Sequence, residues 1–294
     1  MKPITEMGGA MHKLAEGIYV KTGSQDINAG LITTTEGAIL VDTLMLPGEM
    51  RGWARTIRRI AGDTVLFMIL TDQYLDRVLG TSSFDCPVVA HELAWTELRD
   101  YDDETFYQRL ATHFEMLDLD ITAMSEILRP RVPELIVSSE LRMYKGQREL
   151  RLIHLGGHTP ASIGVYLPQQ RILFSGDVVV CGQHPFMGQA NTKQWVEALE
   201  KIRAMDVKII IPGHGPICGM EATLTMTEYL QRARERVREF FLKGATRRDT
   251  VEKSGILDLL PVPADRRLVE TQKVRLGVEH LYAEIRKEES MSRQ

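Results

Sequence analysis

A repeated arrangement constrains what this chain can fold into: short apolar runs of strand length end in loops rich in Asp, His, Gly and Pro. Four runs do this, at residues 64–70, 150–154, 171–175 and 207–211. Apolar runs of this length, bounded by turn residues, are typical of strands within a sheet. Because loops at strand ends present functional side chains, we expect these four loops to carry the functional residues of the chain.

Helices are predicted between and after the strands, where apolar residues recur at helical spacing. Such spacing is found at residues 49–60, 92–128, 193–204, 221–242, 246–254 and 265–288. Strand runs with helices between and after them predict a layered α/β fold.

Composition excludes several classes of protein. The 294 residues are 44% apolar and 26% charged, which excludes disordered, collagen-like and coiled-coil chains. The formal net charge of −4 gives no basic surface for nucleic acid. No apolar run is long enough to cross a bilayer, so we expect no membrane partner, and the N-terminus lacks the apolar segment of a signal peptide. Cys86, Cys181 and Cys218 form no C-x-x-C pair, which favours reduced thiols and a cytoplasmic location.

Three of the four loops carry motifs of Gly, His and Asp. Residues 157–159 read Gly-His-Thr, residues 175–177 read Ser-Gly-Asp, and residues 212–215 read Pro-Gly-His-Gly. An earlier predicted strand, at 38–41, ends at Asp42. The order and spacing of these elements resemble the metallo-β-lactamase superfamily, in a non-lactamase, hydrolase-like branch.

The resemblance covers about residues 17–220 and implies an α/β/β/α sandwich, in which two mixed sheets lie face to face with helices outside. We therefore expect residues 1–220 to form a metallo-β-lactamase-like domain with a helical insertion at about 92–128. Residues 221–294 are expected to form a C-terminal helical extension packed on the same domain. The insertion and the extension are expected to wall the cleft.

The first motif departs from the family pattern. The family reads H-x-H-x-D-H at this point, and aligning its aspartate with Asp76 places Asp72 and Tyr74 where the two leading histidines belong. Arg77 takes the place of the last histidine. The metal site is therefore expected to be degenerate.

The resemblance also implies which residues hold metal. The family's second metal site keeps Asp76, Asp177 and His214 here, and the first keeps His158, with Asp72 and Tyr74 as oxygen donors. Three ligands satisfy one zinc ion and leave a position open for catalysis. We therefore expect one divalent metal, with zinc favoured and manganese or iron suited to the oxygen-rich half, or no metal at all.

The function implied by the resemblance is hydrolysis of an ester, thioester or lactone bond of a small molecule, by water that the metal activates. Asp76, His158 and His214 are the expected catalytic residues. Hydrolysis of true β-lactams is not expected, because the leading histidines are missing.

Two alternatives stay open. Arg77 could neutralise the carboxylates in place of a metal, which would give an inactive pseudoenzyme that binds a small molecule or a protein partner. Tyr74 and Asp72 could instead support an iron centre for redox chemistry. His184 follows Asp177 by a short loop and is a replacement ligand, a proton donor or, as we favour, a loop-fixing residue. The apolar stripe of the predicted last helix is compatible with a homodimer.

Overall fold

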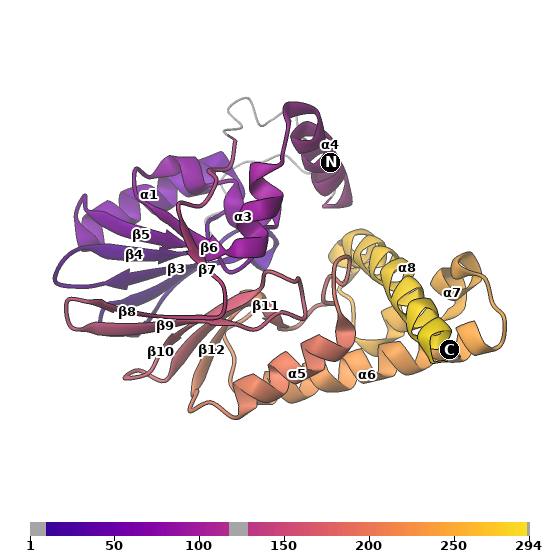
Figure 1. Cartoon of the computed structure of the whole chain (residues 1–294). Coiled ribbons are helices and arrows are strands. Elements are labelled where there is room, and N and C mark those ends of the chain that lie inside the picture. Colours follow the sequence, from indigo (N-terminus) through magenta and orange to yellow (C-terminus); the bar gives the residue numbers. More distant parts are fainter. Residues whose placement is uncertain (1–9, 118–128, 293–294) are drawn as a thin grey trace.

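Two sheets lie face to face in the computed structural model, with helices on both outer surfaces (Figure 1). The structure describes residues 10–117 and 129–292. The expected α/β/β/α sandwich with a C-terminal helical segment is confirmed.

The first sheet has seven strands in chain order within the described residues. The strands are β1 (Met11–Ala15), β2 (Ile18–Thr22), β3 (Asn28–Thr33), β4 (Ala38–Val41), β5 (Val65–Ile69), β6 (Val88–His91) and β7 (Leu135–Val137). Neighbours from β1 to β4 are antiparallel, and neighbours from β4 to β7 are parallel. The sheet is therefore mixed, and the loops after β4, β5 and β6 leave it at the same edge.

The second sheet has five strands in the order β12-β11-β10-β9-β8 within the same residues. The strands are β8 (Glu140–Lys145), β9 (Arg148–His154), β10 (Ile163–Leu167), β11 (Ile172–Val180) and β12 (Ile209–His214). β11 and β12 are parallel, and the other neighbours are antiparallel. The parallel pair brings the loops that follow β11 and β12 to one edge of the sheet.

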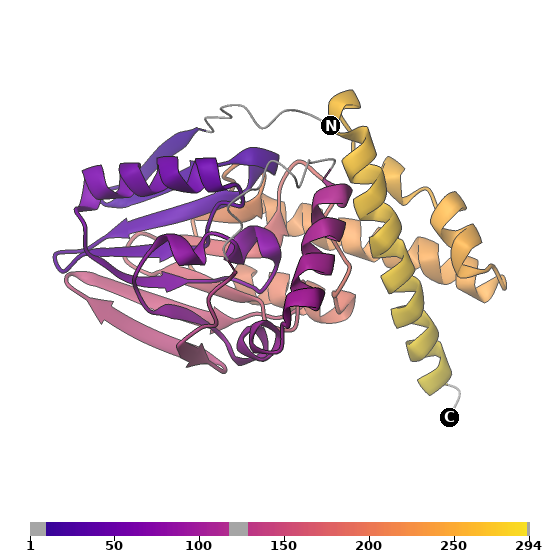
Figure 2. The ribbon, with the colours of Figure 1, turned by 90° about the horizontal axis from the view of Figure 1, so that it is seen from above.

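Helices lie on the outer faces of both sheets, at the sheet edge and beyond the end of the sandwich. They are α1 (Pro47–Ala61), α2 (Leu75–Val78), α3 (Glu92–Arg99), α4 (Asp103–Met116), α5 (Thr192–Arg203), α6 (Glu221–Leu242), α7 (Arg247–Lys253) and α8 (Arg267–Met291). Figure 1 shows α1 and α3 on the first sheet and α5 and α6 on the second. Seen from above, α8 crosses the end of the sandwich beside α4, and the two helices are in contact (Figure 2).

Alternation along the strands builds the core in layers. In β4, Ile39 and Val41 pack between the two sheets, while Ala38 and Leu40 pack toward α1. Successive strand residues point to opposite faces, so a strand with helices on one side and a sheet on the other is apolar throughout. A third apolar layer joins the second sheet to α5, α6 and α8.

The predicted elements differ from the observed ones in three places. β1 was not predicted, and its side chains are exposed or half-buried, so it carries little apolar signal. β11 runs on through Asp177 to Val180, beyond the expected end at residue 175, because the strand bulges at Gly176 and resumes pairing with β12. The helical segment expected at 92–128 is two helices, and its residues 118–128 lie outside the described residues.

The break between α3 and α4 has a local cause. The Asp102 side chain accepts a hydrogen bond from the backbone N–H of Thr105 at 2.7 Å and so begins a new helix.

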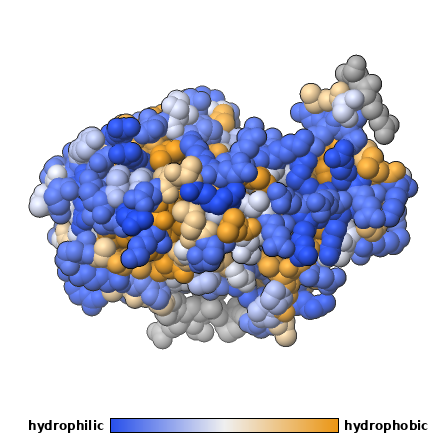
Figure 3. Space-filling model, turned by 90° about the horizontal axis from the view of Figure 1, so that it is seen from below, coloured by the Kyte–Doolittle hydropathy of each residue, from blue (hydrophilic) through white to orange (hydrophobic). Residues whose placement is uncertain are grey.

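The molecular surface is mostly hydrophilic in the view from below, with apolar side chains in several separate patches (Figure 3). In the described part of the chain, no helix combines the length and apolar character that a membrane crossing requires.

Candidate metal centre

Asp42 holds the loop that follows β5. Its carboxylate accepts hydrogen bonds from the backbone N–H and the hydroxyl of Thr71, each at 2.7 Å. Burial raises the pKa of Asp42 to about 6, although Arg77 and the bonds from Thr71 act in the opposite direction. Asp42 therefore supports a loop beneath the site.

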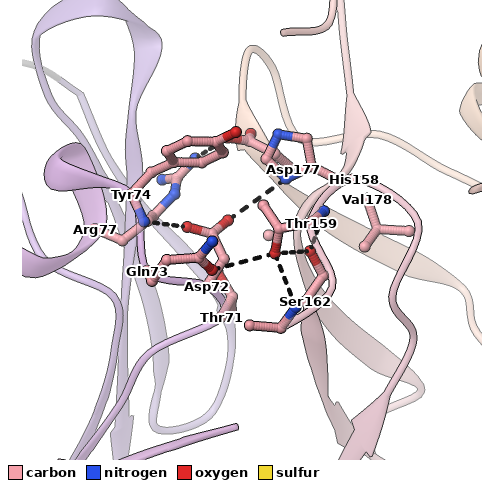
Figure 4. Close-up of polar contacts among 12 residues, drawn as sticks. Thr71, Asp72, Gln73, Tyr74, Arg77, His158, Thr159, Ser162, Asp177 and Val178 are labelled. Carbon is pink, nitrogen blue, oxygen red and sulfur yellow. Dashed lines mark hydrogen bonds and ion pairs between the residues drawn. The ribbon is translucent and has the colours of Figure 1, made fainter. Parts of the chain in front are cut away.

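The loop after β5 is joined to the loop after β9. Asp72 accepts a hydrogen bond from the backbone N–H of Tyr74 at 2.9 Å, which turns the chain into α2. The hydroxyl of Thr159 donates to the side-chain oxygen of Gln73 at 3.2 Å, and the Thr159 backbone N–H donates to Ser162 at 3.0 Å (Figure 4). Asp72 precedes Gln73 in the chain and His158 precedes Thr159, so the bond between Gln73 and Thr159 holds Asp72 and His158 close to each other.

The first group of donor atoms consists of Asp72, His158 and Asp177. One ligand atom from each lies within 4.8 Å of the others, and all three residues are buried. The distance between Asp72 Oδ2 and His158 Nδ1 is 3.7 Å, which is too long for a hydrogen bond. The three side chains therefore converge, but Asp72 and His158 do not form a hydrogen bond with each other.

Unpartnered polar atoms gather at this first group. Asp72 Oδ2, the Tyr74 hydroxyl and both ring nitrogens of His158 are buried and have no hydrogen-bond partner within the described residues. Buried polar atoms are nearly always satisfied, and each exception requires an explanation. A cation between Asp72, His158 and Asp177 would satisfy the Asp72 oxygen and one of the two His158 nitrogens, so the residues present fit a divalent metal ion.

Burial sets the protonation of these residues. It lowers the pKa of His158 to about 4, so the imidazole is neutral near pH 7, as a metal ligand must be. It raises the pKa of Asp72 well above its ordinary value, although Arg77 opposes this. Burial also raises the pKa of the Tyr74 phenol, which therefore keeps its proton. A positive charge at this point would lower the pKa of Asp72 again and favour its ionised form.

The second group of donor atoms, Asp76, Asp177 and His214, also lies within 4.8 Å, but the Arg77 side chain enters it. Arg77 Nη2 is 2.9 Å from Asp177 Oδ2, 3.0 Å from His214 Nδ1 and 3.7 Å from Asp76 Oδ2. Arg77 is fully buried. One guanidinium nitrogen thus contacts or approaches every member of this group, which does not fit a metal ion while Arg77 stays there.

Arg77 and Asp177 each stabilise the charged form of the other. Burial alone raises the pKa of Asp177, but Arg77 and His214 outweigh burial and hold this pKa well below its ordinary value. Burial lowers the pKa of Arg77, but Asp177 and the other nearby carboxylates outweigh it and raise this pKa. Asp177 is therefore an anion and Arg77 a cation at any ordinary pH.

Gly213 allows this close approach. A Cβ atom built at Gly213 would lie 2.2 Å from Asp177 Oδ1 and 2.3 Å from Arg77 Nη2. Real Cβ atoms do not make such contacts, so the ion pair needs glycine at this position.

A cavity of about 450 Å³ covers both groups. Asp76, His158, Asp177 and His214 line it. Its side walls come from α4 and α8, from the loop after β11 and from the loop between β2 and β3. Helices outside the sandwich therefore shape the space above the donor atoms, as the sequence predicted for the insertion and the extension.

The structure brings together all five residues expected to hold metal, which are Asp72, Asp76, His158, Asp177 and His214. It divides them into two groups that share Asp177. His184 belongs to neither group. Its Nδ1 lies 2.9 Å from the Tyr229 hydroxyl and its backbone N–H donates to Glu270 at 2.8 Å, so it fixes a loop of the cavity wall.

Sequence reasoning missed the polar residues of the α8 wall. Glu270 and Lys273 line or support the cavity and are buried, although they are charged. The signal was present: both lie within the apolar face of the last helix, next to Val269 and Val274. Charged residues on the buried face of a helix are rare unless they are paired.

Comparison with known proteins agrees with the fold. Residues 23–214 match the sequence profile described as the metallo-beta-lactamase superfamily, and the chain therefore belongs to this superfamily. It is 24% identical over 263 residues to a linear primary-alkylsulfatase of Pseudomonas sp. (strain ATCC 19151). It is 28% identical over 162 residues to a hydroxyacylglutathione hydrolase of Brucella ovis.

These relatives are matched only in part. The alignments cover 76% of this chain and 49% of the alkylsulfatase, and 50% of this chain and 60% of the hydroxyacylglutathione hydrolase. Among solved structures, a metallo-beta-lactamase family protein from Thermus thermophilus superposes with a TM-score of 0.70 at 17% identity. That match covers 95% of both chains and extends the shared fold through the C-terminal helices.

Proposed function

We propose that the protein is a hydrolase that holds one divalent metal ion between Asp72, His158 and Asp177. The observation that carries the proposal is the set of unpartnered buried atoms at this group, namely Asp72 Oδ2, both nitrogens of His158 and the Tyr74 hydroxyl. The names of the two relatives, an alkylsulfatase and a hydroxyacylglutathione hydrolase, support cleavage of an ester-type bond. A sulfate ester, carboxylic ester, thioester or lactone fits this class.

A divalent metal at this group supplies Lewis acidity, which activates water for attack on the substrate. The residues of the chain do the rest. Asp76 Oδ2 is buried, has no hydrogen-bond partner in the described part of the chain, and lies 3.4 Å from His214 Nε2. This pair faces the cavity and can take up a proton from the attacking water and pass it toward solvent through His214, which is partly exposed.

Tyr74 and Arg77 have separate roles in this proposal. Tyr74 keeps its proton and lines the cavity, so its hydroxyl can donate a hydrogen bond to the oxygen on which charge develops. Arg77 takes the place of a second cation and keeps Asp177 ionised. The two carboxylates and one imidazole of the first group suit zinc, and the oxygen-rich set also suits manganese.

The alternative of a pseudoenzyme has one observation in its favour. Arg77 already neutralises Asp177 within the second group. In that case the cavity would bind a small molecule without cleaving it. The iron-dependent redox variant stays a prediction, and it requires visible absorbance from a tyrosine–iron pair.

Elemental analysis separates these functions. The full chain is expressed with zinc, manganese or iron supplied in turn, and the metal content per chain is measured together with hydrolysis of 4-nitrophenyl esters. We expect one metal per chain in the wild type. Asp72→Asn should lose the metal, while the matched change Asp76→Asn should retain it and lower the rate. A folded wild-type chain with no metal under all three conditions would leave the pseudoenzyme as the remaining function.

A further inference from the structure

A second polar cluster lies in the wall of the same cavity, apart from both donor groups. It consists of Gln183 in the loop after β11, Arg266 at the start of α8, and Glu270 and Lys273 one turn into that helix. Gln183, Glu270 and Lys273 are each more than nine-tenths buried. Gln183, Arg266 and Lys273 line the cavity.

Two cations fix the orientation of the Gln183 amide. Its Oε1 atom accepts a hydrogen bond from Lys273 Nζ at 2.8 Å and another from Arg266 Nη2 at 3.0 Å. Lysine and arginine only donate, so the atom they contact must be the amide oxygen. The other end of the amide is therefore Nε2, and it has no hydrogen-bond partner within the described residues. A buried donor is left for a ligand.

The nearby acceptors are already engaged. Glu270 Oε2 accepts from the backbone N–H of His184 at 2.8 Å, and Glu270 Oε1 accepts from Lys273 Nζ at 3.2 Å. The Asp26 carboxylate accepts from Arg266. By contrast, Gln183 keeps two N–H groups, and Lys273 has used two of its three protons. This part of the cavity wall therefore has free N–H donors on Gln183 and Lys273, which suit a ligand that accepts hydrogen bonds.

The cluster is also tied to the candidate metal centre. Asp26, which holds Arg266, accepts a hydrogen bond at its backbone carbonyl from Gly215 at 3.0 Å, directly after His214. Gln25 and Asp26 both have positive φ angles, 58° and 59°, a conformation that non-glycine residues rarely adopt. The strained loop thus positions the wall and the His214 loop together.

We propose that Gln183, Lys273 and Arg266 form a subsite for a carboxylate or similar oxyanion of the substrate, separate from the bond that is cleaved. The proposal rests on the hydrolase function and narrows its substrate class. The cavity that holds this subsite and the donor groups is also lined by apolar side chains that include Val180, Phe186 and Val269. The substrate is then an ester-type molecule whose short apolar segment carries a second, anionic group.

Equilibrium binding tests the subsite without any need for turnover. The probes are straight-chain dicarboxylates of four to eight carbons, each compared by calorimetry with the monocarboxylate of the same length, on the full chain in zinc-containing buffer. A dicarboxylate can bind at both ends of the cavity, and the monocarboxylate at one. We expect at least one dicarboxylate to bind about tenfold or more tightly than its partner, because a hydrogen bond to a charged group contributes about that factor.

Gln183→Glu removes the two free N–H groups without changing the size of the side chain, and should abolish this preference. Gln108→Glu makes the same change on the α4 side of the cavity and should keep it. If Gln183→Glu does not fold, Gln183→Met provides the same test. Equal binding of every pair, or a preference that persists in the Gln183 variant, overturns the subsite.

The outcome also separates the subsite from the hydrolase function. A dicarboxylate preference that depends on Gln183, in a chain that cleaves no ester, leaves the subsite standing and removes the hydrolase. Cleavage of esters by a chain that shows no dicarboxylate preference supports the hydrolase function and removes the subsite.

Discussion

Arg77 Nη2 lies 2.9 Å from Asp177 Oδ2, and both side chains are buried beneath the cavity. The contact joins α2, which follows a strand of the first sheet, to β11 in the second sheet. The two halves of the sandwich are therefore linked by an ion pair at the point where the donor groups meet.

Arg77→Met should lower the free energy of unfolding by about 3 kcal/mol, because it leaves the buried carboxylate of Asp177 without its cation. Urea unfolding at pH 7 measures the change. Arg58→Met is the matched control, since Arg58 pairs with Asp63 on the surface, and it should cost about 0.5 kcal/mol or less. Equal effects of the two substitutions would show that the buried pair contributes no special stability.

Arg77→His should create a second metal site. It removes the guanidinium from the group of Asp76, Asp177 and His214 and adds an imidazole ligand to it. Metal content should rise from one to two per chain. The triple variant Asp72→His, Tyr74→His and Arg77→His should also hold two metals, with both groups now imidazole-rich. If neither variant gains metal over the wild type, the assignment of ligands to the two groups is wrong.

Acid should destabilise the metal-free protein through His158. The pKa of His158 is lowered from 6.5 in the unfolded chain to about 4 in the folded one. As pH falls, the unfolded chain takes up the proton first, so the contribution to stability is complete above pH 6.5 and is lost between pH 6.5 and 4. Between pH 7 and pH 5 this amounts to about 2 kcal/mol.

Unfolding in the presence of a chelator, compared between the wild type and His158→Gln, isolates this contribution. The comparison cancels the opposite effect of Asp42, whose raised pKa favours the folded state at low pH. Parallel pH profiles of the two proteins would contradict the expectation.

Gly213→Ala should disrupt the site. Its Cβ atom would overlap Asp177 and Arg77, so either the ion pair or the loop after β12 must move. We expect a loss of about 1–3 kcal/mol in stability, together with reduced metal binding. Gly48→Ala is the control: it lies in α1 with open space around it and should stabilise the protein by up to about 1 kcal/mol. A Gly213 variant that matches the control would refute the crowding argument.

Helix and strand positions could be predicted because their signals are local, and the sandwich could be predicted because the motifs that carry the family resemblance are local too. The bounds of α6 follow from helical spacing alone, and the Gly-His-Thr and Pro-Gly-His-Gly loops identify the strand ends that carry His158 and His214. The ligands expected to converge do so. Which metal, if any, they hold stays a prediction.

Other features depend on contacts between distant parts of the chain. The motif placed Arg77 where a metal-binding histidine is expected and left open that its charge neutralises the carboxylates. Its contact with Asp177, one hundred residues later, is visible only in the structure. The wall built by Gln183 and Lys273 likewise requires knowing how α8 docks against the loop after β11. A substitution at a motif position shows that a ligand is lost and suggests what replaces it, but only the packed structure shows which atoms the replacement contacts.

Arg77 differs from a metal ion in one respect that affects how the protein behaves in a cell. A metal exchanges with its surroundings and can be withdrawn by a chelator or by scarcity. A guanidinium is attached to the backbone and stays charged. Part of the positive charge that neutralises this cluster of carboxylates is therefore built into the chain itself. Folding of this region does not depend entirely on the availability of a metal ion.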